Sequence, residues 1–83
     1  MTKQKIKITE KIYSYICDQF PTDEPPNEDT MLFEEGYIDS VGLLSVIYFI
    51  EDTFNLNVVD EDVVGENFGS INTIAAFIER KIS

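Results

Sequence analysis

A serine preceded by an aspartate stands at the start of a long apolar segment. The motif reads Tyr37-Ile38-Asp39-Ser40-Val41-Gly42, and the apolar segment covers 43–50 and runs on to Phe54. A hydroxyl at the N-terminus of a helix faces free backbone N–H groups and the positive end of the helix dipole. That setting suits a phosphate ester. The motif therefore indicates a serine that is modified, although Asp-Ser before an apolar helix is also a common N-cap pair.

The chain lacks the partners that an attacking serine needs. A nucleophilic serine requires a general base within hydrogen-bond reach, but the sequence contains no His and no Lys between Lys11 and Lys81. Ser40 is therefore predicted to accept a group rather than to attack a substrate, and the chain is not expected to be an enzyme. The absence of His and the single cysteine, Cys17, also argue against the usual zinc sites and against disulfides. No metal site is predicted.

The charge is strongly negative and unevenly distributed. The formal net charge is −10, and residues 12–78 contain fourteen acids and no basic residue, whereas four lysines lie near the N-terminus and Arg80 and Lys81 near the C-terminus. Such a field repels nucleic acid and anionic membranes and attracts basic protein surfaces. No stretch approaches the roughly 20 apolar residues of a membrane span. We expect a soluble, cytoplasmic monomer that does not insert into membranes.

The hydrophobic periodicity predicts an all-α domain over residues 1–83, a small four-helix bundle with three main helices and one short one. The expected elements are a first helix over 5–20, a long loop over 21–38, a second helix capped by Asp39 or Ser40 and ending near Phe54-Asn55, a short turn of helix over 60–64 closed by Gly65, and a last helix capped by Ser70.

The apolar side chains of these helices are predicted to form one core. Met31, Leu32 and Phe33 are expected to place one apolar anchor of the long loop in it, and Phe33 is also expected among the aromatic residues of the core. The other predicted core residues are Ile8, Ile12, Tyr15 and Ile16, then Ile71, Ile74, Ala75, Ile78 and Ile82, and the aromatic residues Phe20, Phe54, Phe68 and Phe77.

The second helix has apolar groups on two opposite faces. At 100° per residue, the predicted core face holds Leu43, Val46, Ile47, Ile50 and Phe54, and the opposite face holds Val41, Ser45, Tyr48 and Asp52. An 83-residue chain has little protein left to cover a second face, so this outer stripe is predicted to dock partners. Gly42 costs roughly 1 kcal/mol relative to Ala inside a helix. Either a partner's close approach or simple tolerance explains it.

These residues resemble the acyl and peptidyl carrier proteins. The resemblance covers nearly the whole chain and is strongest in Gly36-Tyr37-Ile38-Asp39-Ser40-Val41, Phe49-Ile50-Glu51-Asp52-Thr53-Phe54 and Val59-Asp60-Glu61-Asp62. It implies that a transferase using coenzyme A attaches 4′-phosphopantetheine to Ser40, and that the resulting thiol holds a cargo as a thioester. It also implies that Asp39 helps to present the serine and the transferase's magnesium. Val41 matches a position usually held by Leu, and Tyr48 matches an exposed docking position.

The chain departs from the common family pattern at three positions. Glycine usually stands three residues before the serine, where this chain has Tyr37 and carries its glycine at Gly36. Gly42 and Ser45 replace acids of the fatty-acid carriers, so docking through this half of the helix should depend less on charge. The Ile-Asp-Ser-Val variant, with Glu-Asn-Phe at 66–68, resembles free-standing carriers that serve dedicated adenylating ligases and hold an amino acid or a specialised acyl group.

The predicted site and its partners follow from this resemblance. Ser40 is the expected attachment point, and the expected motif and docking residues are Tyr37, Ile38, Asp39, Val41, Tyr48, Glu51, Asp52, Asp60 and Glu61. The expected partners are a phosphopantetheinyl transferase, an acyl- or aminoacyl-activating ligase, and acyl-transferring or condensing enzymes of lipid or secondary-metabolite biosynthesis. An arm that folds back between the helices would meet Leu43, Leu44, Ile47 and Ile71. The alternative is an unmodified acidic interaction module that docks through Val41 and Tyr48.

Overall fold

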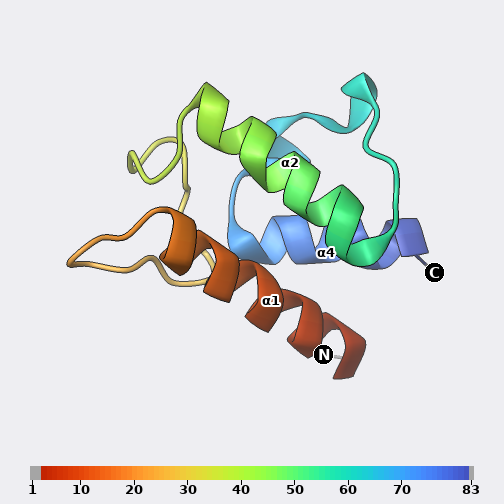
Figure 1. Ribbon diagram of the computed structural model, residues 1–83, viewed down its shortest axis with the longest axis horizontal. Helices are drawn as coiled ribbons and strands as arrows, with labels where there is room; N and C mark the ends of the chain where they lie inside the picture. The colour runs from red at the N-terminus through yellow and green to blue at the C-terminus, as the bar shows by residue number, and fades with distance from the viewer. Residues whose placement is uncertain (1–2, 83) are drawn as a thin grey trace.

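Three long helices and two short helical turns make up the computed structural model, which describes residues 3–82, with side chains from residue 6 onward (Figure 1). No strand occurs in this part of the chain, so the predicted all-α fold is confirmed. The elements are α1 (Lys3–Gln19), α2 (Ser40–Phe54), the 3₁₀ turn η1 (Asp60–Asp62), α3 (Gly65–Phe68) and α4 (Ile71–Ile82).

Helix α4 is the centre of the bundle, because it packs against α1, α2 and α3. In Figure 1, α2 and α4 run from left to right and α1 runs the opposite way. Apolar residues spaced three or four apart give each long helix one buried face. Residues that are fully buried in the core include Ile12, Ile16, Leu32, Val46, Ile50, Ile71, Ile74 and Ile78.

Helices α1 and α2 meet through an aromatic contact. The rings of Tyr15 and Phe49 stack with their centroids 4.0 Å apart, and the Tyr15 hydroxyl donates a hydrogen bond of 3.1 Å to the carbonyl oxygen of Ser45. Burial raises the pKa of Tyr15, although its bond to Ser45 acts in the opposite direction. The hydroxyl is therefore kept as a donor, and it ties the middle of α1 to the first half of α2.

The short helix is the first correction to the predicted elements. The expected turn over 60–64 ends at Asp62, and Gly65 begins α3 instead of closing the turn. The backbone leaves the helical conformation at Val63, with φ −85° and ψ 75°, so the turn ends there. The Asp62 carboxylate caps the start of η1, because it accepts the N–H of Val59 at 3.1 Å, and it pairs with Lys81 on α4 at 2.9 Å. Phe68 at the end of α3 is buried against Phe77, with ring centroids 5.3 Å apart, which favours a separate helical turn there.

The long loop is anchored in the core by a single residue, Leu32, as the sequence predicted. Leu32 is fully buried, whereas Phe33 is 45% exposed and Met31 is also exposed, so the predicted place of Phe33 in the core is wrong. The N–H of Leu32 donates to the carbonyl oxygen of Gly69 at 2.9 Å. This bond holds the backbone of Leu32 beside the start of α4. Ile82, at the end of α4, is likewise exposed.

Candidate functional site

Asp39, rather than Ser40, caps α2. Its backbone is extended, with φ −115° and ψ −170°, and its Oδ1 atom accepts the N–H of Gly42 at 2.8 Å. Its carbonyl oxygen accepts the first helical hydrogen bond, from the N–H of Leu43. Ser40 is consequently the first residue of the helix, and its side chain is not needed for capping.

The hydroxyl of Ser40 is exposed and makes no hydrogen bond to any residue described in the structure. The N–H groups of Ser40 and Val41 also lack an acceptor there, as expected for the first turn of a helix. A phosphate esterified to the Ser40 hydroxyl would place its negative charge beside these amides and the positive end of the helix dipole. The residues present therefore suit an esterified phosphate.

Backbone hydrogen bonds hold the motif in place from the core outward. The carbonyl oxygen of Gly69 accepts from Leu32, whose own carbonyl oxygen accepts from Tyr37 at 2.8 Å and Ile38 at 3.3 Å. The Ile38 side chain is buried, so it positions the motif and offers little surface of its own. The residue before Asp39 is thus fixed to the same core that holds the start of α4.

The shifted glycine of the motif serves a turn. Gly36 has a φ of +80°, a region that residues with a Cβ rarely adopt. The N–H of Glu35 donates to the carbonyl oxygen of Met31, and the N–H of Gly36 donates to that of Phe33. These bonds close the turn just before Tyr37. The glycine therefore stands one residue earlier than in the common family pattern because the chain reverses direction there.

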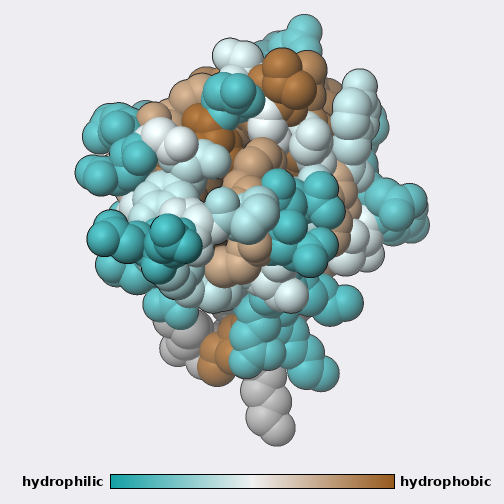
Figure 2. All heavy atoms as spheres, turned by 60° about the vertical axis from the view of Figure 1, so that its left-hand side comes forward, coloured by the Kyte–Doolittle hydropathy of each residue, from teal (hydrophilic) through white to brown (hydrophobic). Residues whose placement is uncertain are grey.

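Three apolar side chains are exposed on the outer face of α2. Val41 is 72% exposed, Tyr48 68% and Leu44 54%. Ser45 is half-buried and Asp52 exposed. Leu44 was expected in a cavity, but its helical angle, 60° from Val41, indicates this outer position. Figure 2 shows apolar side chains gathered in the upper part of one face of the molecule, with hydrophilic ones around them.

The remaining predicted site residues fall into two groups. Tyr37, the first residue of the motif, is half-buried, and its hydroxyl donates to the carbonyl oxygen of Glu24 at 2.6 Å. Glu51 lies eleven residues beyond Ser40, about 16 Å along the helix, and its carboxylate accepts the N–H of Val58 at 3.0 Å. The structure thus brings residues 37–41 together and places the acids Glu51, Asp52, Asp60 and Glu61 farther away, the last three exposed.

An apolar hollow of about 260 Å³ opens one helical turn from Ser40. Of the four residues expected around a folded-back arm, only Leu43 lines it, because Leu44 points outward and Ile71 is fully buried in the core. The long loop and the η1–α3 segment supply its other walls. The hollow is lined by Met31, Phe33, Glu34, Leu43, Val63, Val64, Gly65, Phe68 and Gly69.

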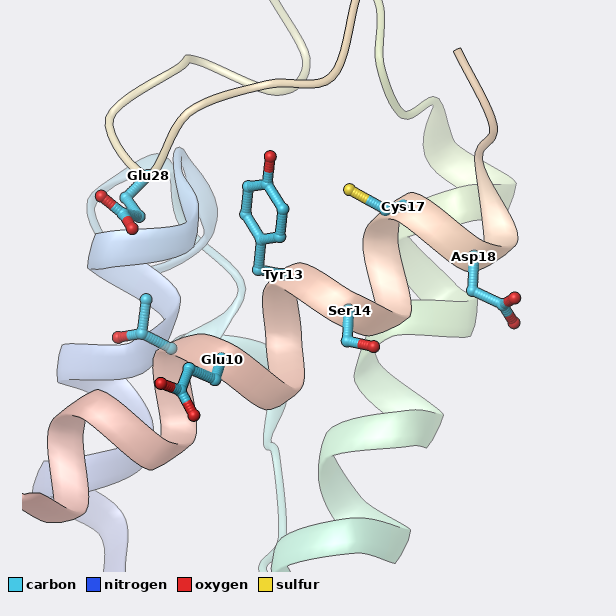
Figure 3. A pocket seen from close by; sticks show the side chains of 7 residues that line it. Glu10, Tyr13, Ser14, Cys17, Asp18 and Glu28 are labelled. Atoms are coloured by element: carbon cyan, nitrogen blue, oxygen red, sulfur yellow. The ribbon is translucent and has the colours of Figure 1, made fainter.

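A second hollow lies beside α1, where Tyr13 stands between Glu28 and Cys17 (Figure 3). Burial raises the pKa of Tyr13, and the nearby Cys17 and Glu28 add to this shift. Among the residues that the structure describes, no group of three His, Cys, Asp or Glu side chains could hold a metal ion. Within residues 3–82, each helix is too short or too polar to cross a bilayer.

Comparison with known proteins identifies the family. No established family profile matches the chain. It is 32% identical to the D-alanyl carrier protein of Lactococcus lactis subsp. lactis (strain IL1403) over 73 residues, which are 87% of this chain and 92% of that protein. The chain belongs to the carrier proteins. The family predicted from residues 36–41 and the two later stretches is therefore confirmed.

In this carrier protein, Ser40 differs from the other serines with described side chains. Ser14 is exposed but lies in the middle of α1, and the Ser45 hydroxyl donates weakly to the carbonyl oxygen of Val41 at 3.4 Å. Ser70 is buried and hydrogen-bonded to Thr73. Only Ser40 combines exposure, a helix start and an unpartnered hydroxyl within the described residues.

Proposed function

We propose that this carrier protein bears 4′-phosphopantetheine on Ser40 and carries an acyl or aminoacyl group from one enzyme to the next. The observation that supports the proposal is the exposed, unpartnered hydroxyl of Ser40 at the start of α2. Residues 1–83 would act as one carrier domain without catalytic activity of its own. The relative's name makes D-alanine the first cargo to test.

The attachment step needs a hydroxyl from this chain and a base from its partner. The Ser40 Oγ atom forms a bond to the phosphorus that carries the pantetheine, the pyrophosphate bond of coenzyme A breaks, and adenosine 3′,5′-bisphosphate leaves. The hydroxyl proton passes to the transferase, since no His or Lys lies near Ser40 in the sequence. The Asp39 Oδ1 atom keeps the helix capped, and its second oxygen is left to face the transferase's magnesium.

Once attached, the arm supplies a thiol that holds the cargo as a thioester at high effective concentration near each docked enzyme. Val41, Leu44 and Tyr48 offer an apolar surface beside the attachment point. The more distant acids would steer the transferase, the activating ligase and downstream enzymes into encounter. The proposal keeps the monomeric state and cytoplasmic location expected from the sequence.

The test is intact mass spectrometry after incubation with coenzyme A, magnesium and a broad-specificity phosphopantetheinyl transferase. We expect a gain of one phosphopantetheine unit in the wild-type chain and none in Ser40→Ala. Ser14→Ala is the matched control, because it removes an exposed helical hydroxyl far from a helix start, and it should be modified as the wild type is. An unmodified wild type would overturn the proposal in favour of the unmodified interaction module, and a modified Ser40→Ala would overturn Ser40 as the attachment point.

The cargo is tested on the modified chain. An adenylating ligase for D-alanine, with ATP, should add one D-alanyl unit that hydroxylamine removes, as it does from a thioester. L-alanine and short fatty acids with their own ligases provide the comparison. Loading by a fatty-acyl ligase alone would keep the carrier role and reject the aminoacyl cargo.

A further inference from the structure

Gly42 lies in the first turn of α2, yet it is buried. A Cβ atom at this position would lie 3.0 Å from Cε1 and 3.1 Å from Cζ of Phe20, closer than ordinary van der Waals contact. It would also lie 3.4 Å from the Oδ1 atom of Asp39, the oxygen that caps the helix. Close approach within this chain therefore explains the glycine, and no partner is needed to account for it.

Phe20 comes from a distant part of the sequence. Its N–H donates to the carbonyl oxygen of Ile16 at 2.9 Å, so it continues the end of α1 just before Pro21. Its side chain is half-buried and packs against the core. The ring that fills the space over Gly42 is thus fixed to α1 rather than to the loop that carries the motif.

The segment after α1 also holds Tyr37, the first residue of the motif. The Tyr37 hydroxyl donates to the carbonyl oxygen of Glu24 at 2.6 Å, and Tyr37 lines one hollow together with Phe20. Residues 20–24 therefore contact the chain on both sides of Ser40. Glu24 binds Tyr37 before the serine, and Phe20 packs over Gly42 after it.

We infer that Phe20 is a positioning residue for Ser40, which acts through its contact with Gly42 and sets how the hydroxyl is presented to the transferase. Phe20 itself touches no reacting atom. Misplacement of a reacting group by about 1 Å can cost up to about a hundredfold in rate, so a shift of a few tenths of an ångström is enough to matter. This inference rests on the proposed modification of Ser40.

The test compares initial rates of phosphopantetheine transfer for Gly42→Ala, Phe20→Leu and the double variant. We expect Gly42→Ala to lower kcat/KM about tenfold, mainly through kcat, since the outer stripe of α2 is untouched. Phe20→Leu alone should also lower the rate, because it removes the ring that positions Gly42. Leucine lacks the ring atoms that the new Cβ would meet, so the double variant should recover part of the loss of Gly42→Ala. Gly65→Ala is the matched control, because a Cβ there meets nothing within 4 Å and should leave the rate unchanged.

Amide chemical shifts in the unmodified chain provide a readout that needs no transferase. Gly42→Ala should shift the resonances of Ser40 and Val41, adding Phe20→Leu to it should restore them in part, and Gly65→Ala should leave them in place. Wild-type rates and shifts for Gly42→Ala, or losses in the double variant that multiply without rescue, would overturn the inference. A wild-type chain that gains no mass would instead overturn the proposed function. The amide chemical shifts would then still show whether the contact between Phe20 and Gly42 positions Ser40.

Discussion

The chain carries a serine at the start of two helices, and the two serines are held in opposite ways. Ser70 is 4% exposed, accepts the N–H of Thr73 at 3.2 Å, and donates its own N–H to the Thr73 hydroxyl at 2.9 Å. Ser40 is exposed and unpartnered among the described residues, because Asp39 has taken over the cap. The Ser70 hydroxyl is buried and caps its helix, whereas the Ser40 hydroxyl stays exposed and available for modification.

The difference shows how a common local pattern is adapted to a second use. Both helix starts satisfy a backbone N–H with a side-chain oxygen, as most helix starts do. At α4 the capping oxygen is the serine itself, and the start is buried behind Gly69, whose carbonyl oxygen holds Leu32. At α2 the capping side chain belongs to Asp39, the residue before the serine. The N–H of Gly42 is therefore satisfied, and the Ser40 hydroxyl still faces solvent.

The strongest test of this comparison is the cap of α2. Asp39→Ala removes the oxygen that accepts from Gly42 and should lower the free energy of unfolding by about 1 kcal/mol, whereas Asp39→Asn, which can also cap, should cost only roughly a few tenths. Both changes remove the carboxylate proposed to face magnesium, so both should slow modification of Ser40. Urea unfolding and transfer kinetics measure the two effects separately. If Asp39→Ala is as stable as the wild type, Asp39 is not the cap.

The elements with local signals could be predicted from the sequence. Asp39 and Ser70 marked two helix starts, and Asn55, whose φ of +53° is the left-handed conformation of a helix end, confirmed the predicted end of α2. The motif around Ser40 could be found for the same reason, since its aspartate, serine and apolar segment are neighbours in the chain.

Features that depend on distant contacts could not be predicted. The long loop is held by a bond between Leu32 and Gly69, which are 37 residues apart, and Leu32 rather than the larger Phe33 is buried there. The reason for Gly42 is a ring 22 residues earlier. The sequence shows the types of these residues but not which of them meet, so the loop, the start of α3 and the support of the motif required the structure.

The two serines themselves give the next prediction. Ser70→Ala should lower the free energy of unfolding by about 1 kcal/mol, because it removes a buried cap, and it should leave modification unchanged. Ser40→Ala should do the reverse, with full stability and no modification. For each variant, thermal or urea unfolding measures the stability, and intact mass after incubation with the transferase measures the modification. Equal losses of stability in the two variants would contradict the distinction between a used and a free hydroxyl.

The smallest expected effect concerns the far end of α4, which, like its start, is held by a polar contact. The hydrogen bond from Lys81, followed by that from the N–H of Val59, lowers the pKa of Asp62 from its ordinary value of 3.8. The folded chain favours the ionised form, so this stabilisation is present above that ordinary value and is lost as the pH falls through the lowered pKa. Lys81→Gln should therefore lower the urea midpoint at neutral pH, and its difference from the wild type should shrink as the pH falls and Asp62 is protonated. Lys11→Gln is the control, since Lys11 forms no ion pair within the described residues, and the gap between the two variants should close in acid. A gap that persists at low pH would assign the contribution of Lys81 to its contact with the Phe77 ring, 5.8 Å from the ring centroid, rather than to Asp62.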